Sequence, residues 1–342
     1  MSYATINKAT DNFNTVLYTG TGSTQSITGV GFQPDMVWGK IRNDTRKHNI
    51  YDSVIGTSKR IVPNDTAAES TVAGVTAFNS DGFSVGTETD MNQNTNTFAS
   101  WNWKAGGTAS SNTDGSITSS VSANATSGFS IVSYTATSGT SSIGHGLGTT
   151  PSCIILKTLD QTGGWVTGFS KLGWDKYLSL QTTSASTTDD RMFSPSGGTD
   201  PTSNLFWSNQ SAIASAGTMI AYCFAEKQGY SKFGKYTGNG STDGTFVYTG
   251  FKPAFVMVKR TDNTHNWYMW DNKINPENVI DKYLQANSSN AEGTDTWGDF
   301  LSNGFKLRTI YSGGNLSGAD YIYMAFAEAP LVGTNNVPCT AR

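Results

Sequence analysis

Short apolar runs rich in β-branched and aromatic residues alternate with polar turns along the whole chain. Runs such as AFVMVKR and CIILK are apolar at nearly every position, which predicts strands buried on both faces. Between the runs stand mostly Gly, Asn, Ser and Asp, the residues that turns favour. Helical periodicity is not sustained; the best helix candidate is NPENVIDKYL, with Asn275 as its cap and Pro276 in the first helical position. The pattern therefore predicts an all-β fold.

The same order of signals occurs three times. Each copy opens with a strand that ends in tyrosine (VLYTGTGST, IVSYTATSG, FGKYTGNGST) and continues through a proline-marked turn into an apolar strand (GFQPDMVWGKIRND, LGTTPSCIILKTLD, GFKPAFVMVKRTDN). Three later segments align without gaps and place Lys59, Lys176 and Lys282 at one position. A hairpin signal, FNSDGFSVG or FLSNGFKLR, recurs in copies one and three, whereas copy two has only SNLFWSN. Such self-similarity is typical of a tandem repeat.

We therefore predict three tandem antiparallel β-sandwich modules of the jelly-roll or lectin-like kind. Each unit has room for roughly seven to ten short strands, which suits a sandwich. The predicted parts are an N-terminal arm (1–11), module 1 (12–106), a Ser/Thr/Gly-rich linker (107–127), module 2 (128–227), module 3 (228–330) and a C-terminal tail (331–342). Within the linker, GSITSSVSA alternates enough to predict an added edge strand.

Composition and charge support this fold and narrow the function. Of the 342 residues, 12% are aromatic and 14% charged, with 37 glycines, which is typical of turn-dense β-structure. The net charge is −3 without a basic run, so we expect no nucleic-acid partner. No stretch approaches the roughly 20 apolar residues of a membrane span, and the first residues lack a secretion signal. We expect buried free thiols at Cys153, Cys223 and Cys339, with a disulfide as the alternative.

The loop TGNGSTDG invites comparison with phosphate-binding loops, which need a preceding strand, a following helix and a lysine or third glycine. Here another strand, TFVYTGF, follows, and the lysine is missing. The sequence therefore predicts a hairpin turn and no cofactor site. Glu226 and Glu328 are carboxylates of the type that glycosidases pair, but they recur once per module, with Lys104 as the counterpart in module 1. We expect them to serve the modules themselves.

Five residues remain as candidates for ligand or interface contacts. His48 and His265 lie in similar contexts, KHNIYD and THNWYMWD, without a nucleophile motif or metal spacing beside them. Exposed tryptophans offer either a subunit interface or a platform on which sugars stack, and otherwise belong to the core. The candidates are His48, Trp165, His265, Trp267 and Trp270. We predict no catalytic, cofactor-binding or metal-binding residues; Asp/Asn-containing loops such as RNDTRKHN have too few carboxylates to predict calcium.

Several phrases together resemble repeated modules in virion proteins of tailed bacteriophages, chiefly marine ones. They are DNFNTVLYTGTGSTQSITGVGFQPDMVW, GFSIVSYTATSGTSSIGHGLGTTPS, GYSKFGKYTGNGSTDG and YIYMAFAEAPLVGTNNVP, and the resemblance runs from about residue 11 to the end. It implies a non-enzymatic structural protein located in the virion after folding in the host cytoplasm, most directly a tail-fibre or adhesion component. It also implies other virion proteins and a host-surface glycan as partners, and a homo-oligomer such as a trimer. The alternatives are a capsid-decoration or head-fibre protein and a carbohydrate-binding or polysaccharide-degrading module.

Overall fold

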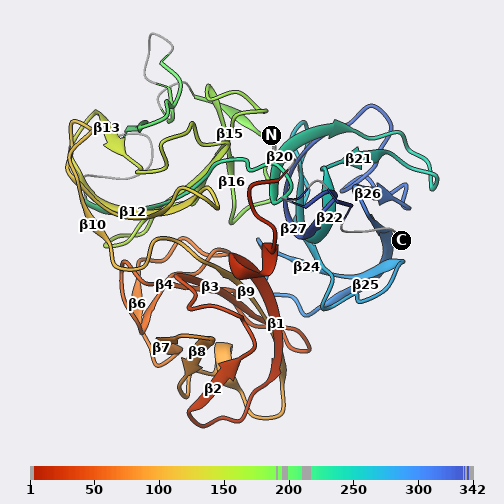
Figure 1. Ribbon diagram of the computed structural model, residues 1–342, viewed down its shortest axis with the longest axis horizontal. Helices are drawn as coiled ribbons and strands as arrows, with labels where there is room; N and C mark the ends of the chain where they lie inside the picture. The colour runs from red at the N-terminus through yellow and green to blue at the C-terminus, as the bar shows by residue number, and fades with distance from the viewer. Residues whose placement is uncertain are drawn as a thin grey trace.

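A computed structural model describes residues 4–189, 192–194, 199–209, 217–333, 335 and 337–338 of the chain. Over these residues the fold is nearly all β, and the named strands pair antiparallel, which confirms the predicted fold class. Helical structure in the described residues is limited to the 3-10 turn η1 (Ala9–Asp11) and the one-turn α1 (Thr89–Asn92). Figure 1 shows three lobes around a common centre.

Lobe one comprises residues 13–103 and holds two facing sheets. The larger sheet has the order β1-β9-β3-β4 (Phe13–Thr19, Thr97–Trp103, Met36–Ile41 and Asn49–Asp52). The smaller has the order β2-β8-β7 (Gln25–Thr28, Gly82–Val85 and Val75–Asn79). A short ladder, β5 with β6 (Lys59–Arg60 and Ser70–Thr71), projects toward lobe two.

Lobe two comprises residues 110–224. Its large sheet has the order β10-β11-β12-β19-β14-β15-β16-β17 (Ser110–Asn112, Ser119–Asn124, Phe129–Ala136, Gly217–Phe224, Cys153–Thr158, Val166–Phe169, Lys176–Ser179 and Thr187–Thr188). A two-stranded ladder of β13 and β18 (Thr140–Gly144 and Leu205–Asn209) accompanies it. Because β10 and β11 extend this sheet, the predicted linker 107–127 is part of the lobe rather than a free connection.

Lobe three comprises residues 231–330. Its strands form one bent sheet in the order β20-β27-β22-β23-β24-β25-β26-β21 (Ser231–Thr237, Asp320–Pro330, Phe251–Arg260, Trp267–Asp271, Ile280–Gln285, Gly293–Leu301, Gly304–Leu307 and Phe246–Tyr248). The predicted helix at NPENVIDKYL is wrong, since β24 begins at Ile280. Asn275 caps the turn instead: its side-chain oxygen accepts hydrogen bonds from the backbone N–H groups of Asp281 and Lys282 (3.1 and 2.9 Å).

One strand order recurs in all three lobes: β1-β9-β3-β4, β12-β19-β14-β15 and β20-β27-β22-β23. The register defines equivalent positions, because Met36 pairs with Trp103, Cys153 with Phe224 and Phe255 with Phe326. It also places Lys59, Lys176 and Lys282 at one position, as the sequence alignment does. In the closing strands, however, the register aligns Glu226 and Glu328 with Ala105, one residue beyond the predicted Lys104.

The cores explain why the central strands are apolar at every position. In β14, Cys153 and Ile155 join a core shared by all three lobes, while Ile154 and Leu156 join the core of lobe two alone. Lobe one divides β3 in the same way, with Trp38 in the shared core and Val37 in its own. Since successive side chains of a strand point to opposite faces, a sheet between two cores needs a continuous apolar run. The predicted strand CIILK is therefore buried between the core of lobe two and the shared core, whereas both faces of AFVMVKR lie in the shared core, which includes the interior of lobe three.

The described part of the N-terminal arm lies beside the end of the last strand. A side chain at Gly229 would meet both Ala4 (2.8 Å) and Pro330 (3.2 Å), so the N-terminal arm lies beside the end of β27. Ala4, Ile6 and Ala9 of this arm are buried. The last strand therefore ends where the first lobe begins. Among the described residues, no helix has the length and apolar character needed to cross a membrane.

Candidate functional site

Backbone hydrogen bonds of the same kind close all three junctions between lobes. In one set, the backbone N–H donors occupy one equivalent position, and the acceptors are backbone carbonyls of the next lobe. The donors Glu69, Ser186 and Glu292 bond to the carbonyls of Leu159, Thr261 and Arg42, in that order (2.7, 2.9 and 2.7 Å). In a second set, the donors are Gly163, His265 and Arg46, and the acceptors are the carbonyls of Thr66, Thr183 and Ser289 (2.9, 2.8 and 2.9 Å). Each set links lobe one with two, two with three and three with one. The chain therefore closes into a ring with approximate threefold symmetry.

Three of the five candidate residues occupy one equivalent position in this ring. His48, Trp165 and Trp267 are fully buried, and one ring nitrogen of each lies within hydrogen-bond distance of a backbone carbonyl of the neighbouring lobe. Trp165 bonds Val62 (2.9 Å), Trp267 bonds Ser179 (3.2 Å) and His48 bonds Gln285 (3.1 Å). These side chains are buried between lobes of the same chain, so of the ligand, interface and core roles considered for them, the structure places them in the interior rather than at an external surface. The similarity between KHNIYD and THNWYMWD suggests that His265 is the counterpart of His48 in the third lobe. The strand register shows instead that Trp267 occupies the position equivalent to His48.

The hydrogen bonds of His48 fix its protonation. Nε2 faces the carbonyl of Gln285, which only accepts, so Nε2 carries the proton. Nδ1 in turn accepts from the indole N–H of Trp38 (2.9 Å). Burial lowers the pKa of His48 well below its ordinary value, and nearby Lys40 adds to this effect. His48 is therefore a neutral ring with both nitrogens in use, and no nitrogen is free to act as a base.

The other two candidates lie in lobe three. Trp270 is buried against Trp297, with ring centroids 5.1 Å apart, so it offers no platform to a sugar. His265 is partly exposed beside Tyr311 at a centroid distance of 5.8 Å. Burial lowers the pKa of His265, as do the neighbouring Arg260 and Lys259. Of the five candidates, only His265 can therefore touch a partner from solution.

Two buried carboxylates near the centre bind aromatic donors from another lobe. Tyr222 of lobe two donates to Asp52 of lobe one (2.6 Å), and Trp101 of lobe one donates to Asp271 of lobe three (3.0 Å). Burial raises the pKa of Asp52 to about 6 and also raises the pKa of Asp271. At the third junction, Phe169 takes the position of the carboxylate and Met324 takes the position of the aromatic donor. Both belong to the shared core, so this pair is apolar. The centre thus keeps two polar pairs and one apolar pair.

Three fully buried lysines, missed in the sequence, also sit at one equivalent position: Lys40, Lys157 and Lys259. Each Nζ donates to the carbonyl of the next residue, at 2.7, 2.7 and 2.6 Å. Burial lowers the pKa of each to about 8. The recurring Lys in GKIRND, LKTLD and VKRTDN was the signal that could have revealed them.

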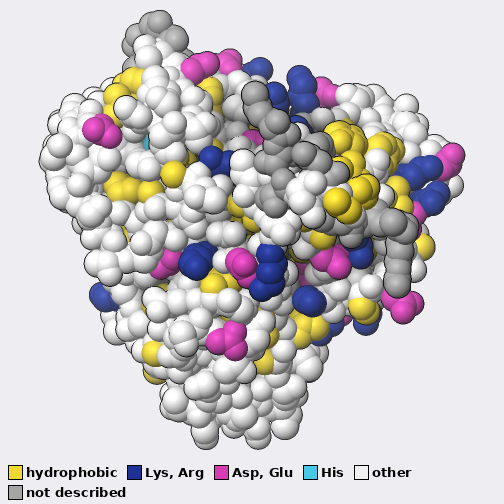
Figure 2. Space-filling view, viewed as in Figure 1, with side chains coloured by type: hydrophobic (Ala, Val, Ile, Leu, Met, Phe, Trp, Pro, Cys, Tyr) yellow, Lys and Arg dark blue, Asp and Glu magenta, His cyan; other side chains and the backbone are white. Residues whose placement is uncertain are grey.

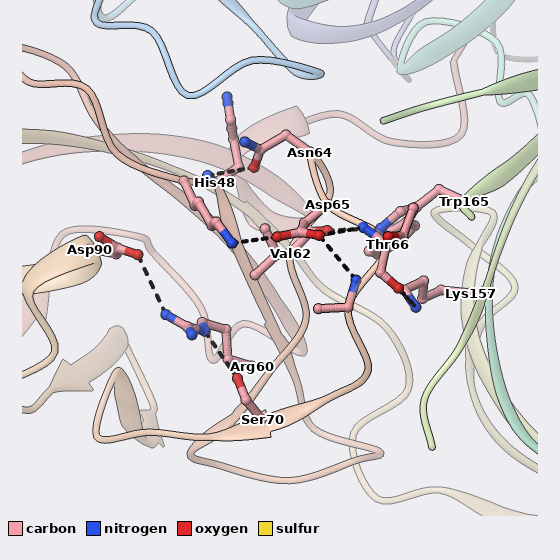
Figure 3. Close-up of polar contacts among 12 residues, drawn as sticks. His48, Arg60, Val62, Asn64, Asp65, Thr66, Ser70, Asp90, Lys157 and Trp165 are labelled. Atoms are coloured by element: carbon pink, nitrogen blue, oxygen red, sulfur yellow. Dashed lines mark hydrogen bonds and ion pairs between the residues drawn. The ribbon is translucent and has the colours of Figure 1, made fainter. Parts of the chain in front are cut away.

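Figure 3 shows how the junction of lobes one and two uses these groups. Lys157 and Trp165 of lobe two reach the carbonyls of Thr66 (3.4 Å) and Val62 on lobe one. The lobe-one loop that presents these carbonyls is held by an ion pair between Lys47 and Asp65. The polar groups in this view are occupied by internal bonds. Their arrangement stabilises the junction.

The glycine-rich loops are organised by buried asparagines. Asn315 accepts from the backbone N–H of Asn239 (3.0 Å) and donates to the carbonyl of Ser241 (2.9 Å), so it holds the Gly238–Gly240 turn between β20 and β21. In lobe one, Asn92 likewise accepts from Thr21 N–H (2.9 Å). The loop is thus a turn between strands, and its backbone N–H groups at Gly238, Asn239 and Gly240 donate to acceptors within lobe three.

The two glutamates considered as glycosidase-type carboxylates form ion pairs. Glu226, just after the last strand of lobe two, pairs with Lys232 at the start of lobe three (2.7 Å), and Glu328 pairs with Lys252 within lobe three (2.9 Å). Across the part of the chain that the structure describes, no cluster of three or more His, Cys, Asp or Glu side chains is arranged to hold a metal ion. Cys153 and Cys223 are buried free thiols, while Cys339 lies outside the described residues.

Comparison with known proteins gives one family. The model of the family described as "Domain of unknown function (DUF7483)" matches residues 8–330. No curated protein and no solved structure matches the chain.

Proposed function

We propose, on the premise that the chain belongs to the DUF7483 family, that it is a non-enzymatic structural protein of a tailed bacteriophage virion, placed in the tail and adhesive toward the host surface. The observation that carries this proposal is the closed ring of junctions. His48, Trp165 and Trp267, the side chains with the most chemistry to offer, are buried and bonded between lobes. Such a ring is a rigid support that leaves loops and lobe surfaces for contact with partners.

The low charge and dense β-structure also suit a part that must survive outside a cell. The resemblance of the four sequence phrases to phage virion modules supports the same role. A partner-binding role agrees with partly exposed aromatic groups on lobe three, among them Tyr311 and Tyr248.

Mass spectrometry of purified particles of the phage that encodes the chain tests the proposal. We expect the chain in the particles at the copy number of a tail part, and antibody-gold labelling at the tail. A copy number near that of the shell protein would favour capsid decoration instead. Absence from particles that contain all other structural proteins would refute a virion role.

A further inference from the structure

A groove of about 270 Å³ lies where lobe two meets lobe three. Its polar lining comes from both lobes: Lys171, Lys176 and Ser186 from lobe two, and Lys235, Asp262 and Asp320 from lobe three. Figure 2 shows dark blue side chains gathered near the upper edge of the molecule, over the region where β15 and β16 approach β20. The volume is close to the lower end for small-ligand sites, about 300 Å³.

The approximate symmetry supplies two internal comparisons for this groove. Lys176 is equivalent to Lys59, and Ser186 is equivalent to Glu69. In lobe one, Lys59 forms an ion pair with Glu69 (2.8 Å). In lobe two the glutamate is replaced by Ser186, whose hydroxyl donates to the carbonyl of Thr261 (3.0 Å). Lys176 has therefore lost the internal partner that its counterpart keeps.

The third junction also keeps its glutamate paired. Glu292, equivalent to Ser186, binds Arg42 through two bonds (2.7 and 3.3 Å). Only the junction between lobes two and three has a neutral residue at this position. Among the described residues, Lys171, Lys176 and Lys235 form no ion pair. Three lysines without an ion-pair partner thus line one groove.

The two aspartates of the groove offset only part of this charge. Asp262 is held by Arg260 through two bonds (2.6 and 3.2 Å), so its charge is already matched. Asp320 accepts a hydrogen bond from the Thr237 hydroxyl (2.9 Å) and keeps a second oxygen for another donor. The groove therefore combines a net positive charge with carboxylate oxygens that can accept from hydroxyl groups.

We propose that this groove binds an acidic saccharide. The lysines attract its carboxylate or sulfate group, and Asp262 and Asp320 accept hydrogen bonds from its ring hydroxyls. A simple anion would use only the lysines, and a neutral sugar would use only the aspartates. The proposal deepens the adhesive role and relies on it for the source of the saccharide, whereas binding itself is a property of the purified chain.

Calorimetric titration of the full chain at low salt tests the site with four probes: an oligogalacturonate, a sulfated oligosaccharide, a neutral maltooligosaccharide and inorganic phosphate. We expect binding of the carboxylated or the sulfated probe, and the stronger of the two identifies the anionic group. Added salt should weaken this binding, because exposed charges are screened. Phosphate and the neutral probe should bind at least about tenfold more weakly, since each lacks one half of the contacts.

The decisive variant is Ser186→Glu, which restores the residue of the other two junctions. Because Glu69 already pairs with Lys59 in the same geometry, the variant should fold and pair with Lys176. We expect it to weaken saccharide binding at least about tenfold, whereas Ser186→Ala should bind as the wild type does. Unchanged binding by folded Ser186→Glu, no binding of either acidic probe, or equal binding of phosphate would overturn the proposal. Failure to find the chain in virions would leave these results unaffected.

Discussion

The buried pair of Asp52 and Tyr222 makes stability depend on pH in a direction that can be worked out. An ordinary Asp has a pKa of 3.8, and burial raises the pKa of Asp52 to about 6. The folded state therefore holds this proton more tightly than the unfolded chain does. The stabilisation from the protonated form is complete below about pH 4 and is lost as the pH rises through 6.

The size of the effect follows from these two pKa values. The two values differ by about two pKa units, and each unit corresponds to about 1.4 kcal/mol. The titration of Asp52 should therefore make the unfolding free energy about 3 kcal/mol lower above pH 7 than at pH 4. The variant Asp52→Asn removes the titration. It can keep the present contacts, since its oxygen can accept from Val54 and Ile55 N–H (2.9 Å each) and its amide can donate to the Tyr222 hydroxyl.

Urea unfolding followed by tryptophan fluorescence between pH 4 and 8 measures the difference. We expect the free energy of wild type minus that of Asp52→Asn to fall by about 3 kcal/mol over this range. Asp281→Asn, at an exposed position, controls for the loss of a carboxylate and should give a parallel profile. In Tyr222→Phe, loss of the hydroxyl should move the transition to higher pH, because that hydrogen bond lowers the pKa of Asp52. Parallel profiles for wild type and Asp52→Asn would refute the reasoning.

Three further predictions concern the ring, the thiols and the chain ends. Trp165→Phe deletes the hydrogen bond to the Val62 carbonyl and should lower the unfolding free energy by about 1 kcal/mol more than Trp270→Phe does. Trp270 is the control, because its indole nitrogen has no partner among the described residues. Equal losses in chemical denaturation would contradict a role for the Trp165 bond. Burial raises the pKa of the Cys153 and Cys223 thiols, so an alkylating reagent should label both only after unfolding, and peptide mass spectrometry that finds either one labelled in the native protein would oppose this. A circular permutant of residues 4–330 that joins Pro330 to Ala4 through a short Gly-Ser linker and begins at Gly107 should fold with an unfolding temperature similar to that of the unpermuted residues 4–330, because Ala4 and Pro330 both adjoin Gly229. An early, broad transition would argue against this prediction.

Sequence reasoning recovered the local part of the fold and missed the ring. Proline-marked turns and apolar runs predict β3, β14 and β22 because those signals are local. The junctions depend on contacts such as His48 with Gln285, which are 237 residues apart. A histidine and two tryptophans share one structural role there, and their different side chains hide the equivalence from a comparison of letters. Burial of Trp267 and Trp270 was likewise undecidable, since an alternating aromatic strand suits either a core or an exposed platform.

Joining three lobes in one polypeptide changes what mutation can do. In an assembly of three identical subunits, a substitution appears at every symmetric site at once, so a gain at one interface must be tolerated at the other two. Here the three equivalent residues Glu69, Ser186 and Glu292 are encoded separately. Ser186 differs from the two glutamates, yet all three make the same backbone hydrogen bond to the next lobe. The molecule can therefore keep the stiffness of a symmetric ring while its faces diverge one at a time. We expect variation among relatives to concentrate on single lobes rather than to recur at all three.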